Sequence, residues 1–303
     1  MKRFFPKKWL YHSQVLLILV LISLSCCQDN HHSSDKKLDE TVINLPERPP
    51  NALTGSELVN VLNPLDLRSR EARILSEILS GNIPDFLREL VPVTYSANIG
   101  DSSYTAIAYT MCDYMALGSD SDYFLIPMTP ILAQELADSL RMSLMTRKMV
   151  DRVWLRSDLK LEPQPIPPTD TMATVPVFAA HNTMVHEQRF QHIAAYPLGS
   201  LVAGHKKDVI LSNRILTHQN KVVIYGWHQL NGVPIQPIYS GHVNWYADYS
   251  HGIRFVSREV VVNGEKRDIR DILTDSELYT LLSDESEPMG MPYYLVDKSS
   301  YPP

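Results

Sequence analysis

Four prolines fall within residues 161–168, which read L-E-P-Q-P-I-P-P. Proline lacks a backbone N–H and fixes φ, so this stretch fits neither a helix interior nor the middle of a sheet. It is therefore predicted to be a long extended crossing or an internal boundary. Apolar residues recur at helical spacing mostly before it, as in Arg68–Leu79, and alternate as in strands mostly after it.

This separation predicts an α+β fold, with a mainly helical N-terminal half packed on a mostly antiparallel sheet from the C-terminal half. Residues 67–285 are expected to form a single domain, followed by a loose tail at 286–303. Further helices are predicted at Ile83–Leu90 and Val185–Ala195. Asn231 and the glycine after it predict a hairpin turn between two strands.

Residues 1–26 are typical of a targeting segment. Basic residues precede Val15–Ile22, an apolar run as long as a signal-peptide core and far short of the ~20 residues that span a bilayer. The following L-S-C-C resembles the lipobox of bacterial lipoproteins, which implies a lipid on Cys26 or Cys27. An ordinary cleaved secretory signal is the alternative. The polar residues 27–66 are expected to form a flexible tether.

Charge and cysteine content exclude several classes of protein. Removing the first 25 residues deletes four of the 28 Lys and Arg and none of the 34 Asp and Glu, leaving a net charge of about −10. An acidic exported domain is poorly suited to nucleic acid. Outside the processing site only Cys112 remains, so neither a disulfide framework nor a cysteine-based zinc site is available. The expected location is extracytoplasmic, lipid-anchored to a bacterial membrane, or secreted if the lipobox is not used.

The densest group of titratable and aromatic side chains lies in residues 239–254, Y-S-G-H-V-N-W-Y-A-D-Y-S-H-G-I-R. His242, Asp248 and His251 offer the imidazole and carboxylate ligands that zinc takes in hydrolytic sites, which makes zinc a candidate cofactor. Metallopeptidases that cut cell-wall peptides also use a His, a downstream Asp and a further His, but here the His–Asp spacing is one residue shorter. The alternative is that these side chains hydrogen-bond a turn.

A second polar stretch, G-H-K-K-D-V-I-L at 204–211, runs directly into an apolar strand. His205 and Asp208 are predicted to join the first group as metal ligands or as an acid–base pair, and Arg254 to hold an anionic group. A solvated charged loop is the alternative interpretation.

Aromatic side chains near both stretches suggest a platform on which a sugar ring could stack. The alternative is ordinary sheet packing, where Trp and Tyr are common. The predicted binding residues are Trp227, His228, Trp245, Tyr246 and Tyr249.

The segments G-H-K-K-D-V, Y-G-W-H-Q-L-N-G-x-P-I-Q-P and Y-x-D-Y-S-H-G-I-R resemble an exported bacterial (lipo)protein family. The resemblance covers about Leu67 to Glu285 and implies one folded unit outside the cytoplasm. It implies no activity. Side-chain chemistry instead suggests a hydrolase that acts on a cell-envelope or extracellular polymer, either a peptidoglycan peptide or a glycan. One form of this hypothesis is a metal-dependent hydrolase. A non-catalytic glycan- or peptide-binding lipoprotein and a structural envelope protein are the alternatives.

Overall fold

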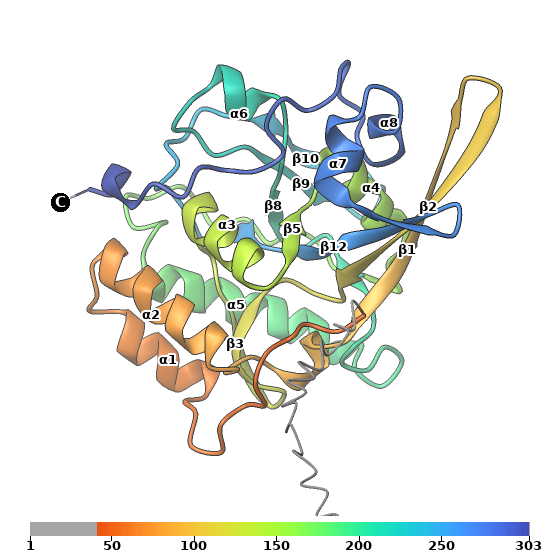
Figure 1. Cartoon of the computed structure of the whole chain (residues 1–303). Helices are drawn as coiled ribbons and strands as arrows, with labels where there is room; N and C mark the ends of the chain where they lie inside the picture. Colours follow the sequence, from red (N-terminus) through yellow and green to blue (C-terminus); the bar gives the residue numbers. More distant parts are fainter. Residues whose placement is uncertain (1–40, 303) are drawn as a thin grey trace, which may run out of the picture. The chain divides into compact units, whose positions relative to one another are not determined.

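Two sheets form the centre of the described part of the chain, residues 41–302 of a computed structural model (Figure 1). The larger sheet has the order β1-β2-β12-β13, with β5 pairing β12, and every pairing in it is antiparallel. Its strands are β1 (Leu90–Ile99), β2 (Ser102–Met111), β5 (Met142–Leu144), β12 (Phe255–Val262) and β13 (Glu265–Asp268).

The second sheet has the order β10-β9-β8-β11, in which only β8 and β11 run parallel. Its strands are β8 (Lys207–Val209), β9 (Ile224–His228), β10 (Pro234–Tyr239) and β11 (His251–Gly252). Two short pairs complete the strands: β3 (Ala116–Ser119) with β4 (Asp122–Leu125), and β6 (Leu159–Lys160) with β7 (Val202–Ala203).

Helices lie around these sheets, and local capping signals set where several of them begin (Figure 1). The side chain of Thr129 accepts a hydrogen bond from the Leu132 amide, and Pro130 lies in the first turn, so these two residues are the local signal that begins α3. The helices are α1 (Gly55–Leu62), α2 (Leu67–Leu79), α3 (Pro130–Ser139), α4 (Arg147–Arg156), α5 (Val175–Gln191), α6 (Arg214–Thr217), α7 (Ile269–Thr274) and α8 (Tyr279–Leu282), with 3-10 turns η1 (Asp85–Leu87) and η2 (Lys298–Ser300).

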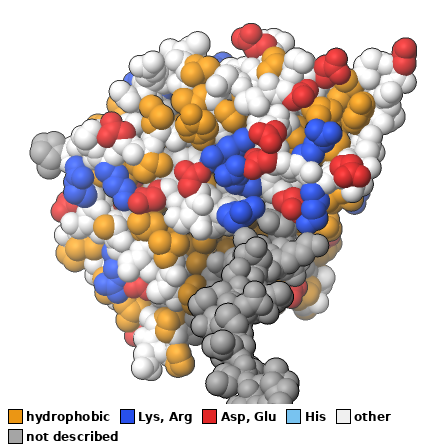
Figure 2. Space-filling view, viewed as in Figure 1, with side chains coloured by type: hydrophobic (Ala, Val, Ile, Leu, Met, Phe, Trp, Pro, Cys, Tyr) orange, Lys and Arg blue, Asp and Glu red, His pale blue; other side chains and the backbone are white. Residues whose placement is uncertain are grey.

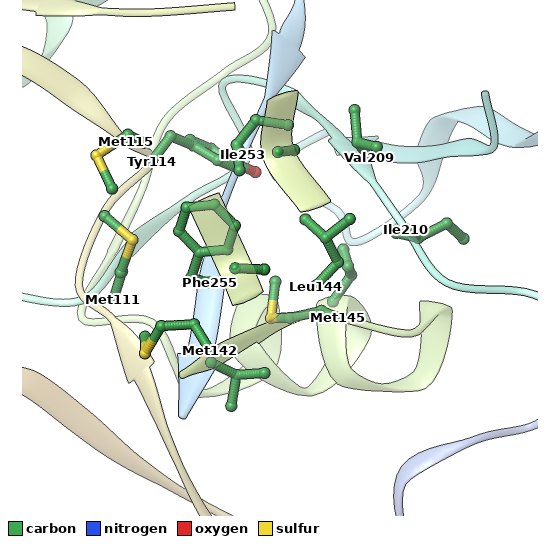
Figure 3. Packing of buried hydrophobic residues seen from close by; sticks show 14 of the residues in the cluster. Met111, Tyr114, Met115, Met142, Leu144, Met145, Val209, Ile210, Ile253 and Phe255 are labelled. Atoms are coloured by element: carbon green, nitrogen blue, oxygen red, sulfur yellow. The ribbon is translucent and has the colours of Figure 1, made fainter. Parts of the chain in front are cut away.

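Apolar side chains from β2, β5 and β12 pack together at the centre of the larger sheet (Figure 3). Met111, Met142, Leu144 and Phe255 are all buried there. Burying each of these side chains stabilises the fold by roughly 1.5–3 kcal/mol. This cluster holds the end of β2 and the start of β12 in place. The residues that follow β2 and precede β12 belong to the site described below.

The α+β class is confirmed, but the predicted separation of helices and strands into two halves is wrong. Strands β1 and β2 come from the first half, and β2 pairs directly with β12 from the second half, with Ile107 opposite Val261. Strand partners are chosen by packing over the whole chain, which local periodicity does not report.

The predicted tether at 27–66 is also wrong for its described part. Ile43 is buried, and α1 lies inside the range assigned to the tether. Thr54 and Glu57 form a capping box at the start of α1, a sequence signal that the prediction missed. The predictions made on residues 1–40, including lipidation at Cys26 or Cys27, lie outside the described residues.

The tail at 286–303 is not loose in its described part. The hydroxyl of Tyr301 donates to the buried carboxylate of Glu71 on α2. The same carboxylate accepts from the amide and the hydroxyl of Thr129, both at 2.7 Å. The end of the chain therefore packs against α2 and the start of α3.

Two predicted helices have different limits in the structure. Only η1 forms within Ile83–Leu90, because Leu90 already begins β1. Helix α5 begins ten residues before the predicted Val185 and ends at Gln191. Residues 161–168 contain neither helix nor strand, as their prolines predict.

Among residues 41–302, none of the helices is both long and apolar enough to span a bilayer.

On the face shown in Figure 2, acidic and basic side chains are interspersed. Pairs such as Arg270 with Asp138, and Arg147 with Asp284, are formed between neighbouring segments, each with N···O of 2.5 Å.

We expect Gly204→Ala to destabilise the fold strongly. Gly204 has φ of +105°, and a Cβ there would lie 2.3 Å from the carbonyl oxygen of Leu161, so the side chain would push the proline-rich segment away from β7. Gly264→Ala is the matched control, because Gly264 has φ of +89° but no atom within 4 Å of the added Cβ.

Urea denaturation should show a loss of about 1–2 kcal/mol for the control, the strain of a left-handed residue, and a clearly larger loss for Gly204→Ala. Equal losses would contradict the assigned close approach of Leu161.

Candidate functional site

The two polar stretches singled out in the sequence lie on adjacent strands. In the parallel pairing of β11 with β8, His251 is opposite Lys207 and Gly252 is opposite Asp208. A Cβ at Gly252 would lie 2.6 Å from the ring of Tyr114, so the glycine lets that ring pack against the strand. Residues more than forty positions apart therefore meet beside a tyrosine from a third segment.

Arg254 is buried and connects three segments of the chain. Its Nη1 donates to the carbonyl of Met111 at 2.8 Å, and its Nη2 donates to the carbonyl of Val202 at 2.6 Å. Its guanidinium carbon lies 4.4 Å from the centre of the Tyr114 ring. Both terminal nitrogens thus serve the backbone, and the predicted role of Arg254 in holding an anionic group is not supported by this arrangement.

His205 is fully buried and pairs with Asp113, the Nε2 to Oδ1 distance being 3.0 Å. Burial lowers the pKa of His205, against the opposing effect of Asp113. Burial would raise the pKa of Asp113, but His205 and Arg254 outweigh it and lower that pKa. The hydrogen bond between the two side chains fixes the orientation of the His205 ring.

Asp208 is buried with only one of its carboxylate oxygens engaged. Its Oδ2 accepts from the hydroxyl of Tyr114 at 2.9 Å, while Oδ1 has no hydrogen-bond partner among the described residues. Burial raises the pKa of Asp208 to about 6, although the Arg254 charge opposes the shift. Asp208 can therefore gain or lose a proton near neutral pH.

A cavity of about 10 Å³ lies against Asp208. This is about the space that one water molecule needs, provided that polar partners are present. Within residues 41–302, Oδ1 of Asp208 lacks a donor and Nε of Arg254 lacks an acceptor. The cavity is lined by Tyr114, Met145, Val150, Val153, Trp154, Ala203, Gly204, Asp208, His228 and Arg254.

His228 connects this cavity to the surface. Its Nε2 lies 2.9 Å from Oδ1 of Asp151, which also accepts from the hydroxyl of Tyr225 at 2.8 Å. The side chain of Asp151 is 40% exposed. The position that a Cβ would take at Gly226 lies 3.4 Å from Oδ2 of Asp208 and 3.5 Å from Cε1 of His228, so carboxylate and imidazole flank this glycine.

Lys206 is buried behind the site, and no carboxylate of residues 41–302 is bound to it. Its ammonium group donates to the carbonyl of Tyr249 at 2.6 Å and lies 3.1 Å from Nδ1 of His181. Burial lowers the pKa of Lys206 to about 7. The group holds the turn before β11 in place rather than facing solvent.

Two of the predicted metal ligands lie close together, with Nε2 of His251 4.0 Å from Oδ2 of Asp248, but the set of three is not assembled. Among residues 41–302, no three His, Cys, Asp or Glu side chains are arranged to hold a metal ion. The carboxylate of Asp248 instead accepts from the amide of Ser250 at 2.8 Å and from its hydroxyl at 2.5 Å, which is the turn hydrogen bonding left open as the alternative. The ring of Tyr246 stacks on His242 and meets His251 edge-on.

The predicted aromatic platform is split between the interior and the surface. Trp227 and Tyr249 are buried, whereas Trp245 is 36% exposed. Burial of Trp227 is completed by Lys207, whose ammonium lies 5.0 Å from the ring centre. The predicted platform residues therefore do not present one shared face to solvent. They are Trp227, His228, Trp245, Tyr246 and Tyr249.

Sequence reasoning missed four residues that build the cavity and its surroundings. Asp113 and Tyr114 follow β2 directly, and polar residues at the end of a strand are a usable signal. Asp151 and Trp154 lie on α4, where no local pattern separates them from ordinary surface residues.

Comparisons with protein-family models, with curated proteins and with solved structures found no match. The chemistry of the site is therefore argued from its own side chains.

The buried His251 predicts a pH dependence of stability. Neither ring nitrogen has a hydrogen-bond partner among the described residues, and burial lowers the pKa of His251 to about 4. The unfolded chain binds a proton on this residue below about pH 6.5, whereas the folded chain stays neutral down to about pH 4. The contribution of His251 to stability is therefore fully present above about pH 6.5 and is lost as the pH falls toward 4.

Between these values each such histidine adds a slope of about 1.4 kcal/mol per pH unit to the free energy of unfolding. His251→Asn should flatten the measured slope by up to this amount, whatever its effect on absolute stability. His218→Asn, at an exposed position, should leave the slope unchanged. An identical slope in both variants would contradict the prediction.

Proposed function

We propose that this protein is an exported hydrolase of a cell-envelope or extracellular polymer, a peptidoglycan peptide or a glycan, with Asp208 and His228 as its catalytic pair. The proposal rests on the water-sized cavity that Asp208 and Arg254 both line, because each of these side chains has one buried polar atom without a partner among the described residues. Export and attachment to the membrane through Cys26 or Cys27 are part of the proposal and rest on the N-terminal sequence.

The arrangement supports a general acid–base mechanism. A water in the cavity accepts from Nε of Arg254 and donates to Oδ1 of Asp208. As its oxygen attacks the electrophilic carbon, its proton passes to the Asp208 carboxylate. His228, oriented by its hydrogen bond with Asp151, donates a proton to the leaving nitrogen or oxygen as the carbon–heteroatom bond breaks. Exchange of protons with solvent then restores both groups.

A non-catalytic glycan- or peptide-binding role is the second candidate, and one surface feature favours it. Tyr239, His242 and Tyr246 form a continuous row of rings, with centroid distances of 5.1 Å and 4.3 Å. Trp245 next to this row is partly exposed. For this role, Trp245→Ala should weaken binding of the purified polymer, while Asp208→Asn should have no effect on it.

Asp208→Asn should remove hydrolysis while leaving the fold intact. The amide cannot take a proton from water, and loss of a general base reduces a rate by about 10²–10⁴-fold. Release of new amino groups or reducing ends from purified envelope polymer measures the reaction. In the unchanged protein, the rate should fall as the pH drops below the Asp208 pKa of about 6. Asp170→Asn, at an exposed position, is the matched control.

The same substitution should also stabilise the protein at pH 7. Because the folded-state pKa of Asp208 is raised from 3.8 to about 6, its ionisation lowers stability as the pH rises through that window. Removing the charge should therefore raise the free energy of unfolding at pH 7 by roughly 1–3 kcal/mol. Unchanged turnover together with unchanged stability would reject the proposed role of Asp208.

Asp151→Asn should separate positioning of His228 from substrate binding. The neutral amide can still accept from His228, but it no longer stabilises the imidazolium. We expect kcat to fall by about 10–100-fold with KM nearly unchanged, since the lost interaction acts mainly in the transition state. Measuring both constants decides the point, and a rise in KM at constant kcat would assign Asp151 to binding instead.

A further inference from the structure

A groove of about 210 Å³ lies between strand β1 and helix α4, beside the residue that orients His228. It is lined by Tyr95 and Ser96 from β1 and by Lys148, Asp151, Arg152 and Leu155 from α4. Asp151 belongs both to this groove and to the pair with His228. Any molecule held here is therefore next to the proposed catalytic pair.

Two cations of the groove lack a carboxylate partner. Nε of Arg152 donates to the carbonyl of Thr94 at 2.7 Å, and Nζ of Lys148 donates to the carbonyl of Thr280. Neither side chain forms a salt bridge within the part of the chain that the structure describes. With the single negative charge of Asp151, the groove carries a net charge of +1.

Tyr95 lines the groove, but its hydroxyl is turned away from solvent. The side chain is only 2% exposed, and the hydroxyl oxygen is itself buried and has no hydrogen-bond partner among the described residues. A ligand in the groove does not reach this oxygen, so its polar contacts come from Lys148 and Arg152.

We propose that this groove binds an organic monocarboxylate, with Lys148 and Arg152 on the carboxylate and Leu155 against its apolar part. The net charge of +1 matches one negative charge better than the two of a phosphate. Leu155 is 60% exposed and supplies an apolar wall. The volume exceeds the ~150 Å³ of an engineered cavity that holds benzene, so a ring-sized group fits.

We infer that this carboxylate belongs to the substrate, and this inference rests on the proposed hydrolysis. A free carboxylate on an envelope peptide is the chemistry that fits, and it would anchor the chain next to His228. Binding of a small carboxylate, by contrast, depends on the groove alone. The two proposals can therefore fail separately.

Benzoate, benzamide and inorganic phosphate are the probes for this site. Titration of the ¹⁵N-labelled protein should shift the amide signals of Ser96 and Arg152 with benzoate. Benzamide has the same shape without the charge and should bind about tenfold more weakly, because charge-assisted hydrogen bonds are lost. Phosphate should not displace benzoate at equal concentration. Equal binding of benzoate and benzamide, or stronger binding of phosphate, would overturn the proposal.

Substitutions on one helix provide matched controls. Arg152→Gln should weaken benzoate binding by about tenfold, whereas Arg156→Gln, exposed at the end of α4, should leave it unchanged. Tyr95→Phe removes only the buried hydroxyl and should leave benzoate binding unchanged. Equal effects at Arg152 and Arg156 would indicate unspecific attraction and overturn the site.

Asp208→Asn should bind benzoate as well as the unchanged protein does, because Asp208 does not line the groove. Lost hydrolysis with retained benzoate binding supports both proposals. Retained hydrolysis in this variant, with benzoate still bound, rejects the catalytic role and leaves the groove intact. Hydrolysis that depends on Asp208 without any benzoate binding rejects the groove alone.

Discussion

The buried guanidinium of Arg254 is the constraint on which the site depends. A charge out of contact with water must be compensated by hydrogen bonds, and here the carbonyls of Met111 and Val202 provide them. The end of β2, strand β7 and the entry to β12 are thereby held around one side chain. The ring of Tyr114 covers the guanidinium and at the same time donates to Asp208. Arg254 is held by these hydrogen bonds, and through Tyr114 it positions Asp208, the carboxylate that we propose for catalysis.

Local signals in the sequence identified local features of the fold. The Thr129–Pro130 start of α3 and the hairpin that joins β9 to β10 were both predictable, because caps and tight turns are decided within a few residues. The pairing of β2 with β12 was not predictable, since about 150 residues separate Ile107 from Val261. The prolines at 161–168 were interpreted correctly as irregular, but not as a segment packed against Gly204.

For the site, residue types were easier to predict than their roles. The stretches around Asp208 and His251 were expected to meet, and the β8–β11 pairing places them side by side. The predicted zinc site is not formed among the described residues, because Ser250 occupies one oxygen of Asp248 and the ring of His242 stacks on Tyr246. His228 was predicted to bind rather than to react, since its partner Asp151 lies on a helix about 80 residues earlier. Partners this far apart in the sequence are brought together only by the tertiary fold.

The contact between Tyr301 and Glu71 links the end of the described chain to helix α2 across 230 positions. Glu71 also holds the amide and hydroxyl of Thr129 at the start of α3. A protease that trimmed the chain just before Tyr301 would therefore do more than shorten a tail. It would leave a buried carboxylate with one donor fewer, and the loss would be transmitted to the first turn of a helix more than 170 residues upstream.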